Sequence, residues 1–263
     1  MIYITGDCHG NYIRFNSEIF PEQDKMTRDD YVIICGDFGY WIPSPAREAA
    51  LNELEKSPFT TLFVDGNHED FDDLNSLPVN MWHGGKVHQI RNHVIHLMRG
   101  QVFTIEGKTF FTFGGAASHD IQGGIFEVKN KEKCLKNKSV VRSDISAGDL
   151  AAYDDACLKS LPFRINHISW WKEEVSSEEE RNEAISHLED NNWKVDFVVT
   201  HDGPQSVISM YSFGDIKPDA TRIFLQNIND KLNYGHWFFG HHHDNKNVTA
   251  KDIMLYEQII RIV

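Results

Sequence analysis

Apolar runs that end abruptly in polar residues mark the first third of the chain. Residues 1–7, 31–37 and 59–67 are β-rich and apolar, and each segment ends in Gly-Asp or Gly-Asn. Stretches of helical character lie between them, at 14–20 and 45–56. This alternation predicts β-α-β units, and therefore parallel strands.

The polar residues at these strand ends recur at a constant interval. Asp7, Asp37 and Asn67 lie 30 residues apart, which is about the length of one β-α repeat. In open α/β sheets the carboxyl ends of parallel strands meet at one edge, where ligands bind. We therefore expect these three side chains to converge.

The pattern changes after residue 93. Residues 93–115 contain two strand-like runs joined by a tight turn at 106–108, which predicts a hairpin. Residues 115–175 are polar, partly basic and without a clear period. No linker divides the chain, so we expect a single domain, 1–263, with an insertion at about 115–175.

The last third of the chain returns to strands and helices. A serine cap and early glutamates predict a helix within 176–192. Phe224, Ile228 and Leu232 share one helical face and predict a second helix. Further strand-like runs end in polar clusters at 200–204 and 240–245.

Five strand ends now carry residues with metal-ligand chemistry. They read GDCHG (6–10), GDFG (36–39), GNHE (66–69), THDGP (200–204) and GHHHDN (240–245). Carboxylate oxygens and imidazole nitrogens suit Mn, Fe and Zn, whereas the lack of thiolates disfavours a cysteine-rich structural zinc site. The set is larger than one four-coordinate ion requires, so we infer two metals that share a bridging carboxylate.

Composition narrows the class of protein. Of 263 residues, 41% are hydrophobic and 25% are charged, as in ordinary globular proteins. There is no apolar run long enough to span a bilayer and no secretory signal, so we expect no membrane association. The four cysteines are scattered, which favours a cytoplasmic protein with reduced thiols. The net charge of −13 disfavours non-specific binding of nucleic acid over the whole surface.

The ordered set of five motifs resembles the signature of the calcineurin-like metallophosphoesterase superfamily. The resemblance implies a four-layer α/β/β/α sandwich with two central mixed sheets and a dinuclear site between them. Carried over by motif position, it implies that Asp7, His9 and His243 hold one metal. Asp37 would bridge both metals, and Asn67, His201 and His241 would complete the second site.

The same resemblance implies the reaction. Two ions, most simply Mn with Fe or Zn as alternatives, would activate a bridging hydroxide that attacks phosphorus. His68 matches the catalytic histidine of the family. Extended backbone points alternate side chains to opposite sides, so His242 should face away from the metals between His241 and His243.

The second motif departs from that of the phosphoprotein phosphatases. Tyr40 and Trp41 stand where those enzymes have an aspartate and an arginine. Both rings are candidates to stack on a planar leaving group, although packing under the following loop explains them equally well. Arg164 is our candidate to replace the missing arginine in substrate binding.

A second resemblance concerns residues 114–120 (GGAASHD) and 164–174 (RINHISWWKEE). They are similar to the GGAxSxD and WWxxE segments of a bacterial and phage branch of the superfamily, here separated by 121–163. The matching residues that could support the ligands or contact phosphate are Ser118, Asp120, Arg164 and Glu174.

The basic segment 129–142 stands out in an acidic chain. It carries five lysines and one arginine against one glutamate, so it is either a flap that attracts nucleic acid or a solvated loop.

The sequence favours a phosphoesterase that leans toward phosphomonoesters. The alternatives are a phosphodiesterase or nuclease and, third, a catalytically dead binding module. A phosphorylated substrate is the expected partner, whether small molecule, nucleotide or protein.

Overall fold

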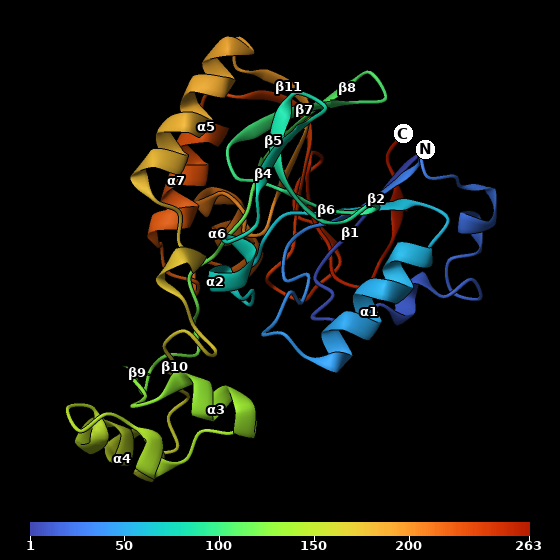
Figure 1. Ribbon diagram of the computed structural model, residues 1–263. Coiled ribbons are helices and arrows are strands. Elements are labelled where there is room, and N and C mark those ends of the chain that lie inside the picture. The colour runs from blue at the N-terminus through green and yellow to red at the C-terminus, as the bar shows by residue number, and fades with distance from the viewer.

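The computed structural model describes residues 1–263 and contains two large mixed β-sheets (Figure 1). The first sheet has the strand order β15-β1-β2-β3-β6-β5-β4. Its strands are β1 (Ile2–Thr5), β2 (Tyr31–Ile34), β3 (Thr60–Phe63), β4 (Val79–Trp82), β5 (Gly85–Arg91), β6 (Val94–Leu97) and β15 (Ile260–Arg261). The neighbours β1, β2, β3 and β6 pair in parallel, as the β-α-β pattern predicts.

The second sheet has the order β13-β14-β12-β11-β8-β7. Its strands are β7 (Gln101–Ile105), β8 (Lys108–Phe113), β11 (Lys194–Thr200), β12 (Asn233–Phe239), β13 (Lys246–Asn247) and β14 (Asp252–Met254). Strands β8, β11, β12 and β14 are parallel, and β7 and β13 are antiparallel edge strands.

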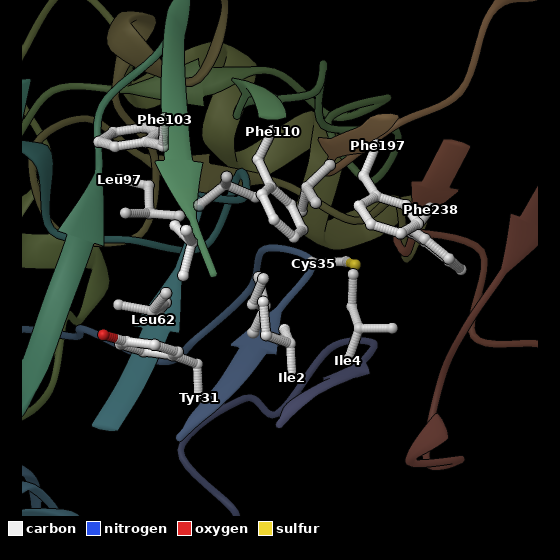
Figure 2. Close-up of a cluster of buried hydrophobic side chains, with 14 of the residues drawn as sticks. Ile2, Ile4, Tyr31, Cys35, Leu62, Leu97, Phe103, Phe110, Phe197 and Phe238 are labelled. Carbon is white, nitrogen blue, oxygen red and sulfur yellow. The ribbon is translucent and has the colours of Figure 1, made fainter. Parts of the chain in front are cut away.

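A hydrophobic core joins the facing surfaces of the two sheets (Figure 2). Ile2, Ile4 and Leu62 of the first sheet lie in one buried cluster with Phe110 and Phe238 of the second. Alternate residues along each strand point to the opposite face, so each sheet has a second apolar face to cover. That requirement produces the two outer layers of helices.

Helices cover both outer faces (Figure 1). Helix α1 (Pro45–Lys56) adds Leu51 and Leu54 to the cluster on the first sheet. The second sheet is covered by α5 (Glu178–Asp190), α6 (Gln205–Ser212) and α7 (Ala220–Asn229). The predicted α/β/β/α sandwich is therefore confirmed.

Local capping explains the accuracy of the helix predictions. Ser44 accepts a hydrogen bond from the N–H of Arg47, with Pro45 at the first helical position, so α1 begins as expected. Ser177 and Glu180 form a capping box at the start of α5. The predicted face of α7, Phe224 with Ile228 and Leu232, is buried against the second sheet.

Two local predictions were wrong. The stretch 14–20 forms no α-helix, because Pro21 disfavours helical backbone in the preceding residue, and only 3-10 turns occur at Ile13–Phe15 and Pro21–Lys25. The first strand-like run of 93–115 is not one strand. It divides into β6 and β7, which belong to different sheets, and only β7 and β8 form the predicted hairpin.

The middle of the insertion forms a small lobe, residues 123–165, set apart from the two sheets (Figure 1). It contains β9 (Ile125–Phe126), α3 (Lys131–Asn137), α4 (Leu150–Leu158) and β10 (Arg164–Ile165). Phe126, Ile145, Ala156 and Ile165 form its own apolar cluster.

Between β3 and β4 lies the one-turn helix α2 (Phe71–Leu74). None of the helices has both the length and the apolar character that crossing a membrane requires.

Candidate metal centre

Five loops that follow parallel strands meet at one edge of the two sheets. Three follow β1, β2 and β3 of the first sheet, and two follow β11 and β12 of the second. The loops bring together all seven residues expected to bind metal, namely Asp7, His9, Asp37, Asn67, His201, His241 and His243.

Four of these residues form the first half of the cluster. Ligand atoms of Asp7, His9, Asp37 and His243 all lie within 4.8 Å of one another. The Nε2 atoms of His9 and His243 are 2.9 Å apart, and His243 Nε2 is 3.2 Å from Asp7 Oδ2. Two imidazole nitrogens and two carboxylates in this space match the donor type and size of a cation site.

Asp37 also contacts the second half of the cluster. Its Oδ2 lies 3.5 Å from His201 Nε2, which is 3.2 Å from Asn67 Oδ1. The rings of His201 and His241 pack edge to face with centroids 4.9 Å apart. His201 Nδ1 donates a hydrogen bond to the carbonyl of Cys35, so Nε2 faces the cluster and can bind a metal ion once it has released its proton.

The backbone at the cluster differs from the extended strand ends expected. His9, Asp37, His241 and His243 all have positive φ, between 42° and 66°. Such left-handed backbone costs a residue other than glycine ~1–2 kcal/mol, and it often occurs where a side chain is held for function.

The segment that carries His241, His242 and His243 is therefore not extended, so the alternation of side chains in a strand does not explain their directions. His242 nonetheless does point elsewhere, because its Nε2 lies 3.0 Å from Asp202 Oδ1. Asp202 is fully buried and also accepts a hydrogen bond from Arg222 Nε at 2.7 Å. The middle histidine thus belongs to a supporting ion-pair network beside the cluster.

Two glycines of the motifs make room for carboxylates. A Cβ atom on Gly66 would lie 2.0 Å from Asp37 Oδ1, and one on Gly240 would lie 2.0 Å from Asp7 Oδ1. Both distances are far inside van der Waals contact, so any side chain here would displace the cluster's own oxygens.

Charge at the cluster is compatible with bound cations. The surrounding histidines outweigh the effect of burial and hold the pKa of Asp37 below its usual range. Burial lowers the pKa of His201, but Asp37 and Asp7 outweigh burial and raise it to about 10. Burial raises the pKa of the Cys8 thiol to about 12, so this thiol is not a thiolate ligand. The oxygen and nitrogen donors of the cluster suit divalent ions.

His68 lies beside the cluster without contributing its side chain to it. Its backbone N–H donates to Asp37 Oδ1 at 2.9 Å, and its ring centroid lies 5.5 Å from that of His9. Burial is the main cause that lowers the pKa of its imidazole, against the charge of Asp37. The ring lines two cavities.

Three acidic residues close to His68 are engaged elsewhere. Asp65 accepts from Arg99 Nε at 2.8 Å. Glu69 accepts from backbone N–H groups of the loop after β2. Asp70 caps α2. None of the three contacts the imidazole.

The smaller cavity has a volume of about 370 Å³. His68, His9, Trp41 and Arg164 all line it, and Trp41 is 48% exposed. Arg164 is held by Asp120 through two hydrogen bonds, one of them 3.0 Å from Nε to Oδ1.

Tyr40 is not brought into this cavity. Its buried ring lies under the guanidinium of Arg47, with 4.3 Å between the Arg47 Cζ and the ring centroid. Tyr40 was expected either to stack on a planar leaving group or to pack under the following loop, and its position matches the second alternative.

The larger cavity has a volume of about 830 Å³ and contains residues that the sequence did not single out. His68, Asp37, His241 and His243 form its floor. Its remaining wall includes His119, Tyr211, Lys217, Arg222 and the middle histidine, His242. The sequence did contain one indication of the ion-pair network around Asp202, because this aspartate directly follows His201 in the motif THDGP. Lys217 lies in a loop with no motif, so only the tertiary structure reveals its place.

The stacked sheets carry a cluster of carboxylates and imidazoles at their shared edge, and this set of donors suits divalent metal ions. The sequence model for calcineurin-like phosphoesterases matches residues 1–245. The chain therefore belongs to the calcineurin-like phosphoesterase family. The predicted family is confirmed.

Among curated proteins, the chain is similar to lariat debranching enzyme A of Xenopus laevis. The two are 26% identical over 143 residues. The match covers 48% of this chain and 26% of the relative, so it spans only about a quarter of that protein's length.

Proposed function

We propose that the enzyme hydrolyses phosphodiesters, with the leaving group in one cavity beside the metal cluster and the retained group in the other. The observation that carries this proposal is the pair of cavities, of about 830 Å³ and 370 Å³, which share His68. A phosphodiester has two organic groups on phosphorus, and a phosphorus atom at the cluster would direct one group toward each cavity. A phosphomonoester would occupy only one of them.

The charge of the smaller cavity supports the same choice. A monoester carries a terminal phosphate dianion, for which arginine is well suited because its planar fork binds phosphate through two hydrogen bonds. Arg164 is the nearest candidate, but Asp120 already occupies its fork. A diester carries a single negative charge and needs less compensation.

We assign the seven residues of the cluster to two metal ions. Asp7, His9 and His243 would hold one ion, and Asp37 would contact both. Asn67, His201 and His241 would complete the second. When bound, the ions would stabilise negative charge on the phosphoryl oxygens and favour ionisation of water. Manganese suits these oxygen and nitrogen donors, and iron or zinc would also fit them.

His68 is assigned as the catalytic histidine. The attacking water releases a proton to solvent and its oxygen forms the new bond to phosphorus while the bond to the leaving oxygen breaks, and the protonated ring of His68 gives the leaving oxygen a proton. Its position between the two cavities supports this role. Trp41 presents a half-exposed ring to the smaller cavity, where it can stack on a planar group of the substrate.

The similarity to an enzyme named for lariat debranching also favours the diester. Phosphomonoesters remain the second candidate, because the GDxHG and GNHE motifs resemble those of phosphatases and the smaller cavity alone would accept one organic group.

Nucleic acid is the macromolecular substrate that the basic segment 129–142 would attract. Three of its six basic residues are already paired within the chain. Lys131 pairs with Asp72, Lys133 with Asp144 and Arg142 with Asp154. Lys129, Lys136 and Lys138 form no ion pair, so the attraction is limited to these three exposed residues.

We also propose that 1–263 acts as one catalytic domain with the lobe as an insertion, and that it works in the cytoplasm. All four cysteines are free, in keeping with a reducing compartment.

Hydrolysis of two matched esters tests the choice of substrate. Bis(p-nitrophenyl) phosphate and p-nitrophenyl phosphate release the same leaving group, so kcat/KM compares them directly in Mn²⁺-reconstituted enzyme. We expect the higher value for the diester. A higher value for the monoester would establish the second candidate. Hydrolysis of neither ester, with no stimulation by metal, would revive the dead binding module.

A further inference from the structure

The side-chain amide of Asn67 can face the cluster with either its oxygen or its nitrogen, whereas a carboxylate would present an oxygen in both orientations. Its oxygen can bind a cation, whereas its nitrogen carries two hydrogens and cannot, and the two ends have nearly the same shape. Asn67 Oδ1 faces the cluster, 3.2 Å from His201 Nε2. Asn67 Nδ2 faces away and donates to Ser118 Oγ at 3.2 Å. The partners of the amide therefore decide whether it offers an oxygen to the metal.

Ser118 is itself held by Glu174. The Ser118 hydroxyl donates its single proton to Glu174 Oε2 at 2.6 Å, and the Ser118 backbone N–H donates to Oε1 at 2.8 Å. With its proton directed to the carboxylate, Ser118 Oγ can only accept on the side of Asn67. All three residues are buried, with exposures of 3% for Asn67, 8% for Ser118 and 2% for Glu174.

The two ends of the insertion hold this chain of hydrogen bonds in place. At the start, the Gly115 N–H donates to the carbonyl of Asp65 at 2.9 Å, two residues before Asn67. At the end, Arg99 Nη2 donates to the carbonyl of Glu173 at 2.8 Å. Arg99 is bound to the carboxylate of Asp65. Ser118 and Glu174 are thus fixed relative to the end of β3, which carries Asn67.

We propose that Glu174 is a positioning residue that acts through Ser118 to turn Asn67 Oδ1 toward the second metal ion. The inference rests on the proposed function, because it assumes that Asn67 is a ligand. This gives the insertion a role that sequence alone does not reveal. Its two ends determine whether Asn67 presents its oxygen or its nitrogen to the metal ion.

Exchange of Glu174 for glutamine tests the direction of the hydrogen bonds with almost no change in shape. The Ser118 N–H still requires an acceptor, so the glutamine oxygen would face it and the glutamine NH₂ would face Ser118 Oγ. The serine proton would then point to Asn67 and favour the flipped amide, with Nδ2 toward the metal. We expect Glu174→Gln to weaken one of two Mn²⁺ sites by about 10- to 100-fold, the range for residues that orient metal ligands.

Isothermal titration of the metal-free full chain with Mn²⁺ measures this effect without reference to activity. Glu173→Gln is the matched control, since it makes the same charge change one residue away, outside the hydrogen-bonded chain, and should leave both sites intact. Ser118→Ala removes the acceptor for Asn67 Nδ2 and should weaken the same site, which keeps the test decisive if Glu174→Gln folds poorly by circular dichroism.

Asn67→Ala separates this inference from the proposed ligand set. Loss of one site in Asn67→Ala together with wild-type binding in Glu174→Gln and Ser118→Ala would overturn the positioning role and leave the ligand set standing. Two intact sites in Asn67→Ala would overturn both. Equal weakening in Glu173→Gln and Glu174→Gln would assign the effect to charge alone and also refute the proposal.

Discussion

Replacement of His68 by alanine separates catalysis from metal binding in this enzyme. The only hydrogen bond between His68 and the cluster runs from its backbone N–H to Asp37 Oδ1, at 2.9 Å. Alanine keeps that N–H, so the substitution removes the imidazole from both cavities and leaves the carboxylate of Asp37 supported. Metal binding should therefore survive a change that abolishes proton transfer.

The size of the effect follows from the role assigned to the ring. Proton transfer by a positioned side chain contributes ~10²–10⁴-fold to a rate. We therefore expect kcat for bis(p-nitrophenyl) phosphate to fall by that factor, which corresponds to about 2.7–5.4 kcal/mol of transition-state stabilisation. Mn²⁺ content, measured by mass spectrometry of the dialysed protein, should stay at the wild-type value.

The control is His236→Ala, which removes an exposed imidazole from β12 and should change neither quantity. Loss of metal in His68→Ala in proportion to the loss of activity would refute the reasoning, because it would make His68 a ligand or a structural support. A wild-type kcat would likewise exclude proton transfer by this residue.

Four further substitutions probe other parts of the structure. His242→Ala should retain both ions, since its side chain is directed to Asp202, whereas His243→Ala should lose one; mass spectrometry of bound metal distinguishes them. Arg99→Met leaves the buried Asp65 without its cation, so the free energy of unfolding should fall by about 3–5 kcal/mol in urea at neutral pH; an unchanged midpoint would exclude a stabilising pair. Trp41→Ala should lower kcat/KM for aryl diesters by roughly 5- to 150-fold if the ring stacks on substrate, and bound metal should not change.

The elements that the sequence predicts well are those specified by neighbouring residues. Helix α1 occupies Pro45–Lys56, the stretch 45–56 read from the sequence, because Ser44 caps it and Pro45 suits its first turn. The run 93–105 shows the opposite case. Its apolar residues predict extended backbone correctly, but which sheet each part joins depends on partners far away in the chain.

The site shows the same division. Residue type and place after a strand pointed to five strand ends, and motif position in the family resemblance chose from them the seven side chains that the fold brings together. The left-handed backbone at Asp37 or His241 was not predictable, because nothing in the local sequence requires positive φ at these residues. Lys217 and the amide partner Ser118 depend on tertiary contacts, and only the fold could place them.

A crystal of the protein grown with Mn²⁺ tests the central claim most directly. Anomalous scattering at the manganese edge would locate each ion against the protein. We expect two peaks that share the carboxylate of Asp37, one beside His9 and His243 and the other beside Asn67 and His201. A single peak, or peaks that do not both contact Asp37, would contradict the two-metal centre proposed here.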